Sequence, residues 1–212
     1  AALAAGVPVE RVRLVGLPIS LRFSEGRPGR AEARRVLGLA ERPTVLIMGG
    51  GEGMGRVESI AHALGAGLVA VNGQAIVICG RNASLQRRLS GSTWTTPVHV
   101  LGFVENMPVW MSAADCLVTK AGPGTIAEAL ACGLPIVLSD FVPGQEEGNV
   151  RYVQDHGVGV FSADPSEIAG VVREWLDAAN PAAASMQEKA RALARPRAAL
   201  EIAEVVSERF LR

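Results

Sequence analysis

The chain has 212 residues, of which 49% are hydrophobic and 20% charged, with 21 basic and 21 acidic side chains. A formal net charge of zero argues against a protein that wraps nucleic acid, because such proteins are usually strongly basic. No apolar run approaches the ~18 residues that a membrane-spanning helix needs. The three cysteines are an odd number and argue against a disulfide framework, so we expect reducing surroundings.

Along the chain, short apolar segments alternate with longer segments of helical spacing. Strands are predicted at residues 12–15, 44–48, 75–79, 98–101, 116–119, 136–138 and 158–161. Helices are predicted at residues 29–38, 56–68, 84–90, 106–113, 124–132, 147–156, 165–178, 181–194 and 197–211. Apolar runs without polar alternation are typical of strands buried on both faces. The pattern predicts an α/β fold, a Rossmann-like doubly wound parallel sheet with extra carboxyl-terminal helices.

The amino-terminal part of the chain carries a local excess of basic side chains. Residues 10–42 hold eight Arg and four Glu, and residues 22–30 are predicted to form a loop or linker. A solvated, Arg-rich helix and loop is the simpler interpretation of this excess. The alternative is a surface that faces anionic lipid, which requires an apolar patch beside the positive charge.

A glycine-rich loop, Met48–Gly55, follows the predicted strand 44–48 and leads into a helix. Its glycines allow backbone N–H groups to approach a ligand, and the helix amino terminus favours a phosphate. The loop does not match the dinucleotide fingerprint, because Met54 and Arg56 stand where the final glycine is needed. It also lacks the Lys-Ser/Thr pair of a P-loop. We expect a phosphate-binding loop without ATP hydrolysis, with a tight structural turn as the alternative.

Further candidates follow neighbouring strands, at the edge of the sheet where ligands bind in this kind of fold. Arg81 follows strand 75–79 and either supplies positive charge to a pyrophosphate or caps a helix at the surface. Phe103 follows strand 98–101 and either lies beside a planar base or belongs to the core.

The strongest loop, Lys120–Thr125, follows strand 116–119 and starts a helix with Gly-Pro-Gly. Glu128, about one turn into that helix, can accept hydrogen bonds from two vicinal hydroxyls, as on a ribose. The alternative is a carboxylate that complements the helix dipole. Gln145, Glu146 and Asn149 follow the next strand and are polar groups of the kind that orient sugar hydroxyls. Gln145 and Asn149 share one face if this segment is helical.

Several kinds of chemistry have no matching motif in the sequence. The five aspartates form no D-x-D pair, the His and Cys residues have no zinc spacing, and there is no G-x-S-x-G. We therefore predict no protein-held metal and no cofactor. These absences fit a nucleotide-sugar site that stabilises pyrophosphate with backbone dipoles and cations.

Taken together, the motifs resemble the carboxyl-terminal half of a GT-B glycosyltransferase of family 28. They are GLPI (16–19), GGGEGMG (49–55), ICGRN (78–82), GFV (102–104), TKAGPGTIAEA (119–129), PGQEEGN (143–149) and LARP (193–196). The resemblance implies one donor-binding domain over residues 1–212. Residues 1–30 resemble the interdomain linker and first strand, and residues 179–212 the carboxyl-terminal helices. The amino-terminal acceptor domain is expected to lie outside this chain.

The resemblance also implies a set of donor-binding residues. They are Gly50, Gly51, Glu52, Gly53, Arg81, Phe103, Val104, Lys120, Gly122, Gly124, Thr125, Glu128, Gln145, Glu146 and Asn149. In that picture the backbone of Val104 pairs with uracil, Phe103 lies beside the base, and Glu128 holds the ribose. The start of the helix after Lys120 meets the diphosphate, while the polar residues at 145–149 recognise the sugar. Lys120 and Arg81 add positive potential, and the glycine loop lies near phosphate and acceptor.

The members of the family that the motifs resemble transfer galactose from UDP-galactose to diacylglycerol, with inversion at the anomeric carbon. By resemblance, the acceptor site, most of the membrane contact and the general base belong to the missing domain, so no catalytic residue is assigned here. The expected location is peripheral at a membrane, either the plastid envelope or the cytoplasmic face of a bacterial membrane.

Other functions remain open from the residues alone. The alternatives are a related lipid transferase that uses a glucosyl or N-acetylglucosaminyl donor, a UDP-sugar epimerase, and a UDP-sugar binder without catalysis. A nucleotide-binding oxidoreductase is disfavoured, because the glycine fingerprint is not satisfied.

Overall fold

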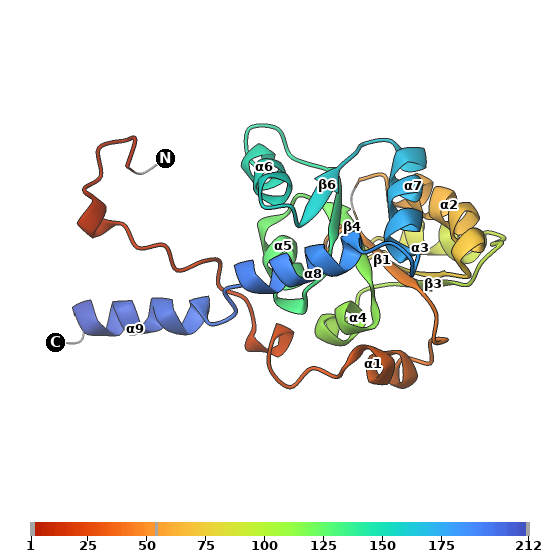
Figure 1. Ribbon diagram of the computed structural model, residues 1–212, viewed down its shortest axis with the longest axis horizontal. Helices are drawn as coiled ribbons and strands as arrows, with labels where there is room; N and C mark the ends of the chain where they lie inside the picture. Colours follow the sequence, from red (N-terminus) through yellow and green to blue (C-terminus); the bar gives the residue numbers. More distant parts are fainter. Residues whose placement is uncertain (1–2, 54, 211–212) are drawn as a thin grey trace.

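Six apolar segments pair as the strands of one parallel sheet in the computed structural model, which describes residues 3–53 and 55–210 (Figure 1). The strands are β1 (Thr44–Met48), β2 (Gln74–Ile78), β3 (Val98–Leu101), β4 (Cys116–Lys120), β5 (Ile136–Asp140) and β6 (Gly159–Phe161). Their order across the sheet is β3-β2-β1-β4-β5-β6. The strand order reverses between β1 and β4, and ligands bind at the carboxyl ends of the strands beside such a point.

Helices connect the strands and follow the last of them. The α-helices of the described residues are α1 (Arg30–Val36), α2 (Val57–Gly67), α3 (Ala83–Ser90), α4 (Met107–Ala113), α5 (Pro123–Cys132), α6 (Glu147–Asp155), α7 (Pro165–Leu176), α8 (Ala182–Leu193) and α9 (Ala198–Phe210). Short 3₁₀ helices are η1 (Val9–Arg11), η2 (Leu21–Phe23) and η3 (Leu68–Val71). The predicted α/β fold with extra carboxyl-terminal helices is confirmed.

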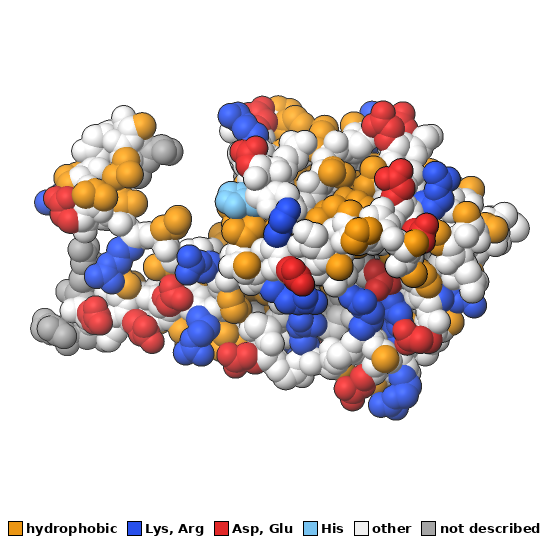
Figure 2. Space-filling view, in the orientation of Figure 1, with side chains coloured by type: hydrophobic (Ala, Val, Ile, Leu, Met, Phe, Trp, Pro, Cys, Tyr) orange, Lys and Arg blue, Asp and Glu red, His pale blue; other side chains and the backbone are white. Residues whose placement is uncertain are grey.

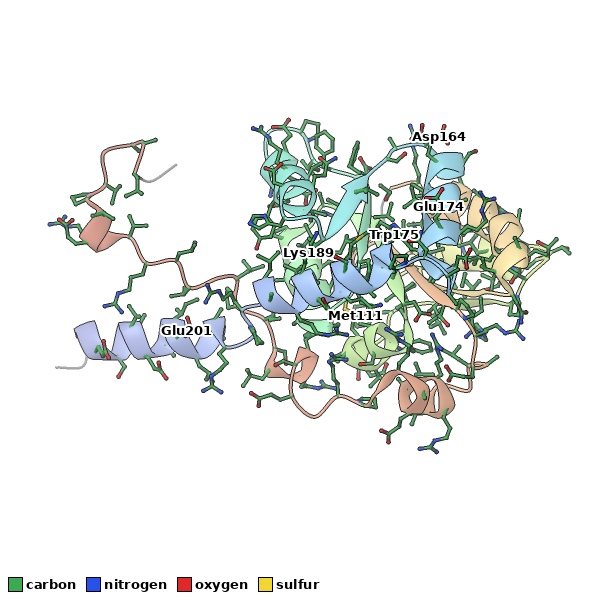
Figure 3. All side chains as sticks on the ribbon, in the orientation of Figure 1. Met111, Asp164, Glu174, Trp175, Lys189 and Glu201 are labelled. Atoms are coloured by element: carbon green, nitrogen blue, oxygen red, sulfur yellow. The ribbon has the colours of Figure 1, made fainter. Side chains whose placement is uncertain are left out.

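The sheet is buried on both faces by helices. Leu46 and Leu117 point to one face, where they pack with α1, α4, α5, α6 and α8. Val45 and Val118 point to the opposite face, which α2, α3 and α7 cover. Figure 3 labels one residue of each cluster, Met111 of α4 and Trp175 of α7. Burial on both faces explains why the strand sequences are apolar without alternation.

The strand predicted at residues 12–15 is wrong. Residues 12–20 belong to no strand or helix, and the segment leaves the body of the protein on the same side as α9 (Figure 1). Val15 instead lines a hollow with Ile202, Val205 and Val206 of α9. Of this run, Val15 is thus partly covered by a helix, whereas Leu14 is 92% exposed.

Other boundaries differ by little. The strand predicted at 75–79 starts and ends one residue earlier, and α9 ends at Phe210, so residue 211 of the predicted helix lies outside the described residues. Met54 of the glycine loop also lies outside them. No helix in the described part of the chain combines the length and the apolar content needed to cross a bilayer.

Part of the amino-terminal basic excess serves the fold. Arg34 is only 5% exposed, donates to the carbonyl of Ala113 (3.0 Å) and pairs with Asp115 (2.6 Å) and with Glu41. Arg30 also pairs with Asp115, at 2.9 Å. The solvated interpretation therefore fails for Arg34, and Figure 2 shows basic side chains below α8 interspersed with acidic ones.

Candidate functional site

The loops after β1 and β2 pack backbone against backbone at the carboxyl edge of the sheet. Gly53 and Gly80 both have positive φ (+57° and +58°). A methyl group on Gly53 would lie 2.2 Å from the carbonyl oxygen of Cys79, and one on Gly80 would lie 2.2 Å from that of Gly51. The Arg81 amide donates to the same Gly51 oxygen at 2.8 Å. This close packing explains the glycine at position 53 and agrees with the alternative interpretation of the loop, a tight structural turn.

Gly50 and Gly51 have more space around them than Gly53, although the backbone of Gly50 still requires glycine. Gly50 has φ +73°, and a methyl group there would lie 3.8 Å from Cε of Lys120. At Gly51 the nearest atom would be a nitrogen of the Arg81 guanidinium, at 4.0 Å. These two positions form the open part of the glycine loop, facing β4 and the loop after β2.

Arg81 contacts two other predicted site residues. Its Nη1 lies 2.9 Å from Oε1 of Glu52, and its guanidinium carbon lies 4.9 Å from the ring centroid of Phe103. Phe103 is 56% exposed, so the core interpretation of this residue is wrong. The helix-capping alternative for Arg81 is also wrong, because the side chain of Asn82 caps α3 by accepting from the Leu85 amide at 2.9 Å. Val104 is half-buried and packs against the core beside α4.

Lys120 occupies the point where the strand order reverses. Its Nζ lies 2.6 Å from Oε1 of Glu146 and 3.4 Å from the position of a methyl group on Gly122. Glu146 is 4% exposed, and its second oxygen accepts from the Val142 amide at 2.9 Å. Burial alone would raise the pKa of Glu146, but the hydrogen bonds from Lys120 and Val142 outweigh it and lower the pKa. Both carboxylate oxygens are thus engaged within the protein.

The amino terminus of α5 opens beside Lys120. Gly122 is the N-cap residue and Pro123 takes the first helical position, where its missing N–H is no loss. The first-turn N–H groups, including those of Gly124 and Thr125, have no partner within the helix. A methyl group on Gly124 would meet no atom within 4 Å. Free backbone donors and the positive end of the helix dipole suit an anion at this place.

Glu128 lies one turn further along α5 and is half-buried. Burial raises the pKa of its carboxyl group to about 7. Among the described residues, no hydrogen bond or ion pair involves this carboxyl group. A half-buried acid without a donor is the state expected of a group that accepts hydrogen bonds from a ligand.

The loop after β5 contributes one anchored and one exposed side chain. Asn149 of α6 donates from Nδ2 to the carbonyl oxygen of Ala121 at 2.8 Å, which ties α6 to the start of α5. Gln145 is exposed and precedes α6. Its backbone N–H donates to the Val142 carbonyl oxygen in a turn. The condition for a shared face of Gln145 and Asn149 is not met, because the helix begins only at Glu147, as predicted.

Sequence reasoning did not single out Asp140 as a site residue. It ends β5, is exposed, and its Oδ2 would lie 3.5 Å from a methyl group on Gly55, so it faces the glycine loop. Its position at a strand end was the available signal. In the described ranges, no group of three or more His, Cys, Asp and Glu side chains is arranged to hold a metal ion.

Eight of the fifteen predicted residues form two groups. Gly50, Lys120, Gly122, Glu146 and Asn149 gather where β1 and β4 end, while Glu52, Arg81 and Phe103 form a second group nearer β3. Glu128 and Gln145 have no side-chain hydrogen bond to either group among the described residues.

A doubly wound sheet of this order, with an open helix amino terminus and a glycine loop at the carboxyl ends of its strands, is the carboxyl-terminal half of a GT-B glycosyltransferase fold. The chain belongs to glycosyltransferase family 28, since the family's C-terminal domain model matches residues 44–205.

Relatives of known name agree with this assignment. The chain is 46% identical over 213 residues to the probable chloroplastic monogalactosyldiacylglycerol synthase of Glycine max, covering 98% of this chain and 40% of the relative. It is 46% identical over 207 residues to the chloroplastic monogalactosyldiacylglycerol synthase 3 of Arabidopsis thaliana, covering 95% of this chain and 44% of the relative. The chain thus spans well under half of the length of these relatives.

Solved structures show the same fold at low sequence identity. The glycosyltransferase WaaG of lipopolysaccharide biosynthesis superposes with a TM-score of 0.69 at 21% identity, over 94% of this chain and 57% of that one. The Anabaena protein HepE, solved with UDP-glucose, superposes with a TM-score of 0.63 at 18% identity, over 97% of this chain and 60% of HepE. A putative UDP-N-acetylglucosamine 2-epimerase of Listeria monocytogenes superposes with a TM-score of 0.72 at 12% identity, over 99% of this chain and 56% of that one. At these identities the likeness concerns the fold alone.

Proposed function

We propose that this chain is the UDP-galactose-binding half of an inverting hexosyltransferase that transfers galactose to 1,2-diacylglycerol. The observation that carries the proposal is Lys120, held by buried Glu146 between the open glycine loop and the amino terminus of α5. This arrangement offers a cation and unpaired backbone donors to one diphosphate. The names of the relatives at 46% identity supply the sugar and the acceptor.

The remaining residues divide the donor among them. Gly122, Gly124 and Thr125 donate backbone N–H groups to the diphosphate, and Glu128 accepts from the two ribose hydroxyls. Phe103 and the backbone of Val104 hold the uracil. Gln145 and Asn149 orient the sugar, while Glu146 contributes mainly by fixing Lys120, since both of its oxygens already accept hydrogen bonds.

In the transfer, the bond between the anomeric carbon and the β-phosphate oxygen breaks, and negative charge develops on UDP. The α5 amino terminus and Lys120 stabilise that charge in place, which is the usual role of preorganised donors. The acceptor hydroxyl gives its proton to a general base, which we assign to no residue of this chain. No metal or cofactor is proposed.

Acceptor binding and membrane attachment are proposed for a protein of the length of these relatives, of which this chain covers 40–44%. We propose that the lipid acceptor is presented by a further domain and that the protein is peripheral at a membrane. The chloroplastic names of the relatives favour the plastid envelope. A UDP-sugar epimerase is less well supported, because that likeness rests on 12% identity.

Isothermal calorimetry of the chain against UDP, UDP-galactose, UDP-glucose and GDP, with and without Mg²⁺, tests the proposal. We expect UDP and UDP-galactose to bind without Mg²⁺, UDP-glucose to bind more weakly than UDP-galactose, and GDP to bind least. A folded chain that binds no uridine nucleotide would refute the donor site. A new UDP-sugar formed during incubation without any lipid would support the epimerase instead.

A further inference from the structure

Arg81 joins three loops that follow three neighbouring strands. Its backbone is fixed, because its amide bonds to the Gly51 carbonyl at 2.8 Å and because only glycine fits the preceding position. Its side chain spans from Glu52, at 2.9 Å, to the face of Phe103, at 4.9 Å. The anchored part of Arg81 is therefore its main chain, and the guanidinium extends from it across the edge of the sheet.

Phe103 has little else to fix its ring. The side chain is 56% exposed, whereas its neighbour Val104 is half-buried and packs against the core beside α4. A planar guanidinium over an aromatic face is an attractive contact with a defined geometry. Arg81 thus contributes to the orientation of the ring, and Glu52 to the placement of the guanidinium.

The charges of Arg81 and Lys120 are both partnered, by Glu52 and Glu146 respectively, so their positions rather than their pairing distinguish them. Lys120 lies beside Gly50 and Gly122, at the start of α5. Arg81 lies over the ring of Phe103, at the end of β3, and this position suits a role toward the base.

We infer that Arg81 is a positioning residue for base selection, which holds the Phe103 ring as one wall of the uracil pocket while Glu52 holds Arg81. The inference rests on the proposed function. It assigns Arg81 to recognition of the nucleobase, acting through Phe103, rather than to the diphosphate.

The test compares the affinities of UDP, CDP and GDP for the wild-type chain, R81M, F103L and the double variant by calorimetry. We expect R81M to weaken UDP about three- to tenfold and to change CDP and GDP less than about twofold, because stacking contacts at exposed sites have this size. F103L should act alike, and the double variant should lose no more than F103L alone. R81K should recover part of the loss, because a lysine keeps a cation over the ring.

Two further variants test the role of Glu52 and provide a control. E52Q should weaken UDP in the same direction, since a neutral amide holds the guanidinium less firmly than the carboxylate does. R87M is the matched control, because Arg87 is exposed on α3 and none of its described contacts reaches Phe103; its affinities should equal those of the wild type.

Three results would overturn the inference. Equal losses of UDP, CDP and GDP in R81M, or tighter UDP binding by E52Q, would place Arg81 on the phosphate. Additive losses in the double variant would show that Arg81 does not act through Phe103. A wild-type chain that binds none of the three nucleotides would refute the proposed function itself.

Discussion

Glu128 is an acid that the fold keeps half-buried without a hydrogen-bond donor among the described residues. Burial raises the pKa of the carboxyl group to about 7, so ionising it near neutral pH costs folding free energy. Glu128 lies one turn into α5, so this energetically costly carboxylate is close to the proposed diphosphate site at the start of the helix. A ligand with two vicinal hydroxyls would supply the missing donors.

The first prediction concerns E128Q. Because the folded pKa lies above the unfolded one, the folded state binds the proton more tightly, and wild-type stability falls as the pH rises toward about 7. The amide removes this loss. The free energy of unfolding of E128Q should therefore exceed that of the wild type by roughly 2–3 kcal/mol at pH 8 and equal it near pH 4. Urea denaturation at both values measures the difference.

The same variant should bind UDP more weakly. Loss of the ionised acceptor should cost roughly 1–3 kcal/mol above pH 8, and the ratio of wild-type to E128Q affinity should rise through about pH 7, because the titration of the UDP phosphate is common to both proteins. Calorimetry across this pH range checks the result. Unchanged UDP affinity in E128Q would remove Glu128 from the site, even if its effect on stability is found.

Lys120 and Glu146 allow a second prediction at this scale. Their side chains are 27% and 5% exposed, so K120M leaves a buried carboxylate without its cation and should cost about 2–4 kcal/mol of unfolding free energy. The double variant K120M/E146Q should recover part of that loss. The pKa of Glu146 is lowered, so the pair stabilises the fold above the unfolded pKa, and this contribution is lost as the pH falls through the lowered value.

The matched comparison is R81M, which breaks the Arg81–Glu52 pair. Both side chains there are more than 60% exposed (65% and 63%), so its removal should cost less than about 1 kcal/mol. Urea denaturation of all three variants orders the effects. Equal losses for K120M and R81M would show that burial of Glu146 does not decide the energy of its pair.

At the scale of elements, secondary structure is predicted best where the local sequence pattern of a segment is enough to indicate how the segment is buried. The largely apolar runs of β1, β2, β4 and β5 indicate strands covered on both faces, and helices lie on both faces of the sheet. Residues 12–15 carry a similar signal apart from Arg13, but a strand also requires a neighbouring strand, and Val15 meets α9 instead. The packing of Gly53 and Gly80 was beyond prediction, because it joins residues far apart in the chain.

The start of α5 provides a prediction that separates binding from stability. G124A adds a methyl group where no atom lies within 4 Å, and alanine favours helix over glycine by up to about 1 kcal/mol, so the melting temperature should stay equal or rise. The methyl group should nevertheless obstruct the diphosphate and weaken UDP at least about tenfold. Thermal melting and calorimetry of one preparation measure both.

G170A is the matched control, because Gly170 lies within α7 and also has no atom within 4 Å of a new methyl group. It should gain similar stability and keep its UDP affinity. If G124A binds UDP as tightly as G170A, the diphosphate does not lie over the first turn of α5.

At the scale of the whole molecule, the sheet order brings together loops that lie far apart in the sequence. The glycine loop after β1 meets the loop after β4 because these strands are neighbours, although β2 and β3 separate them along the chain. The edge that holds the site follows from the rule that ligands bind at strand carboxyl ends. The specific pairs Lys120–Glu146 and Arg81–Phe103 follow from side-chain geometry, which local sequence patterns do not encode.

The arrangement of the ends leads to the last prediction. The site residues lie on the body of the protein, whereas α9, marked by Glu201 in Figure 3, extends away from it. Deleting residues 201–212 keeps the buried Ala198 and should leave the UDP dissociation constant within about twofold. It also removes Ile202 and Val205, which face Val15, so the segment around residues 9–16 should lose its cover.

Trypsin reports on that cover, because Arg11 and Arg13 lie in the exposed segment. We expect cleavage there to be several-fold faster in the truncated chain than in the full chain, while cleavage after Lys120, which lies in β4, stays slow in both. Unchanged cleavage at Arg11 and Arg13 would show that α9 does not protect this segment in solution. Loss of UDP binding on truncation would show that the donor site depends on a helix that contributes none of its residues.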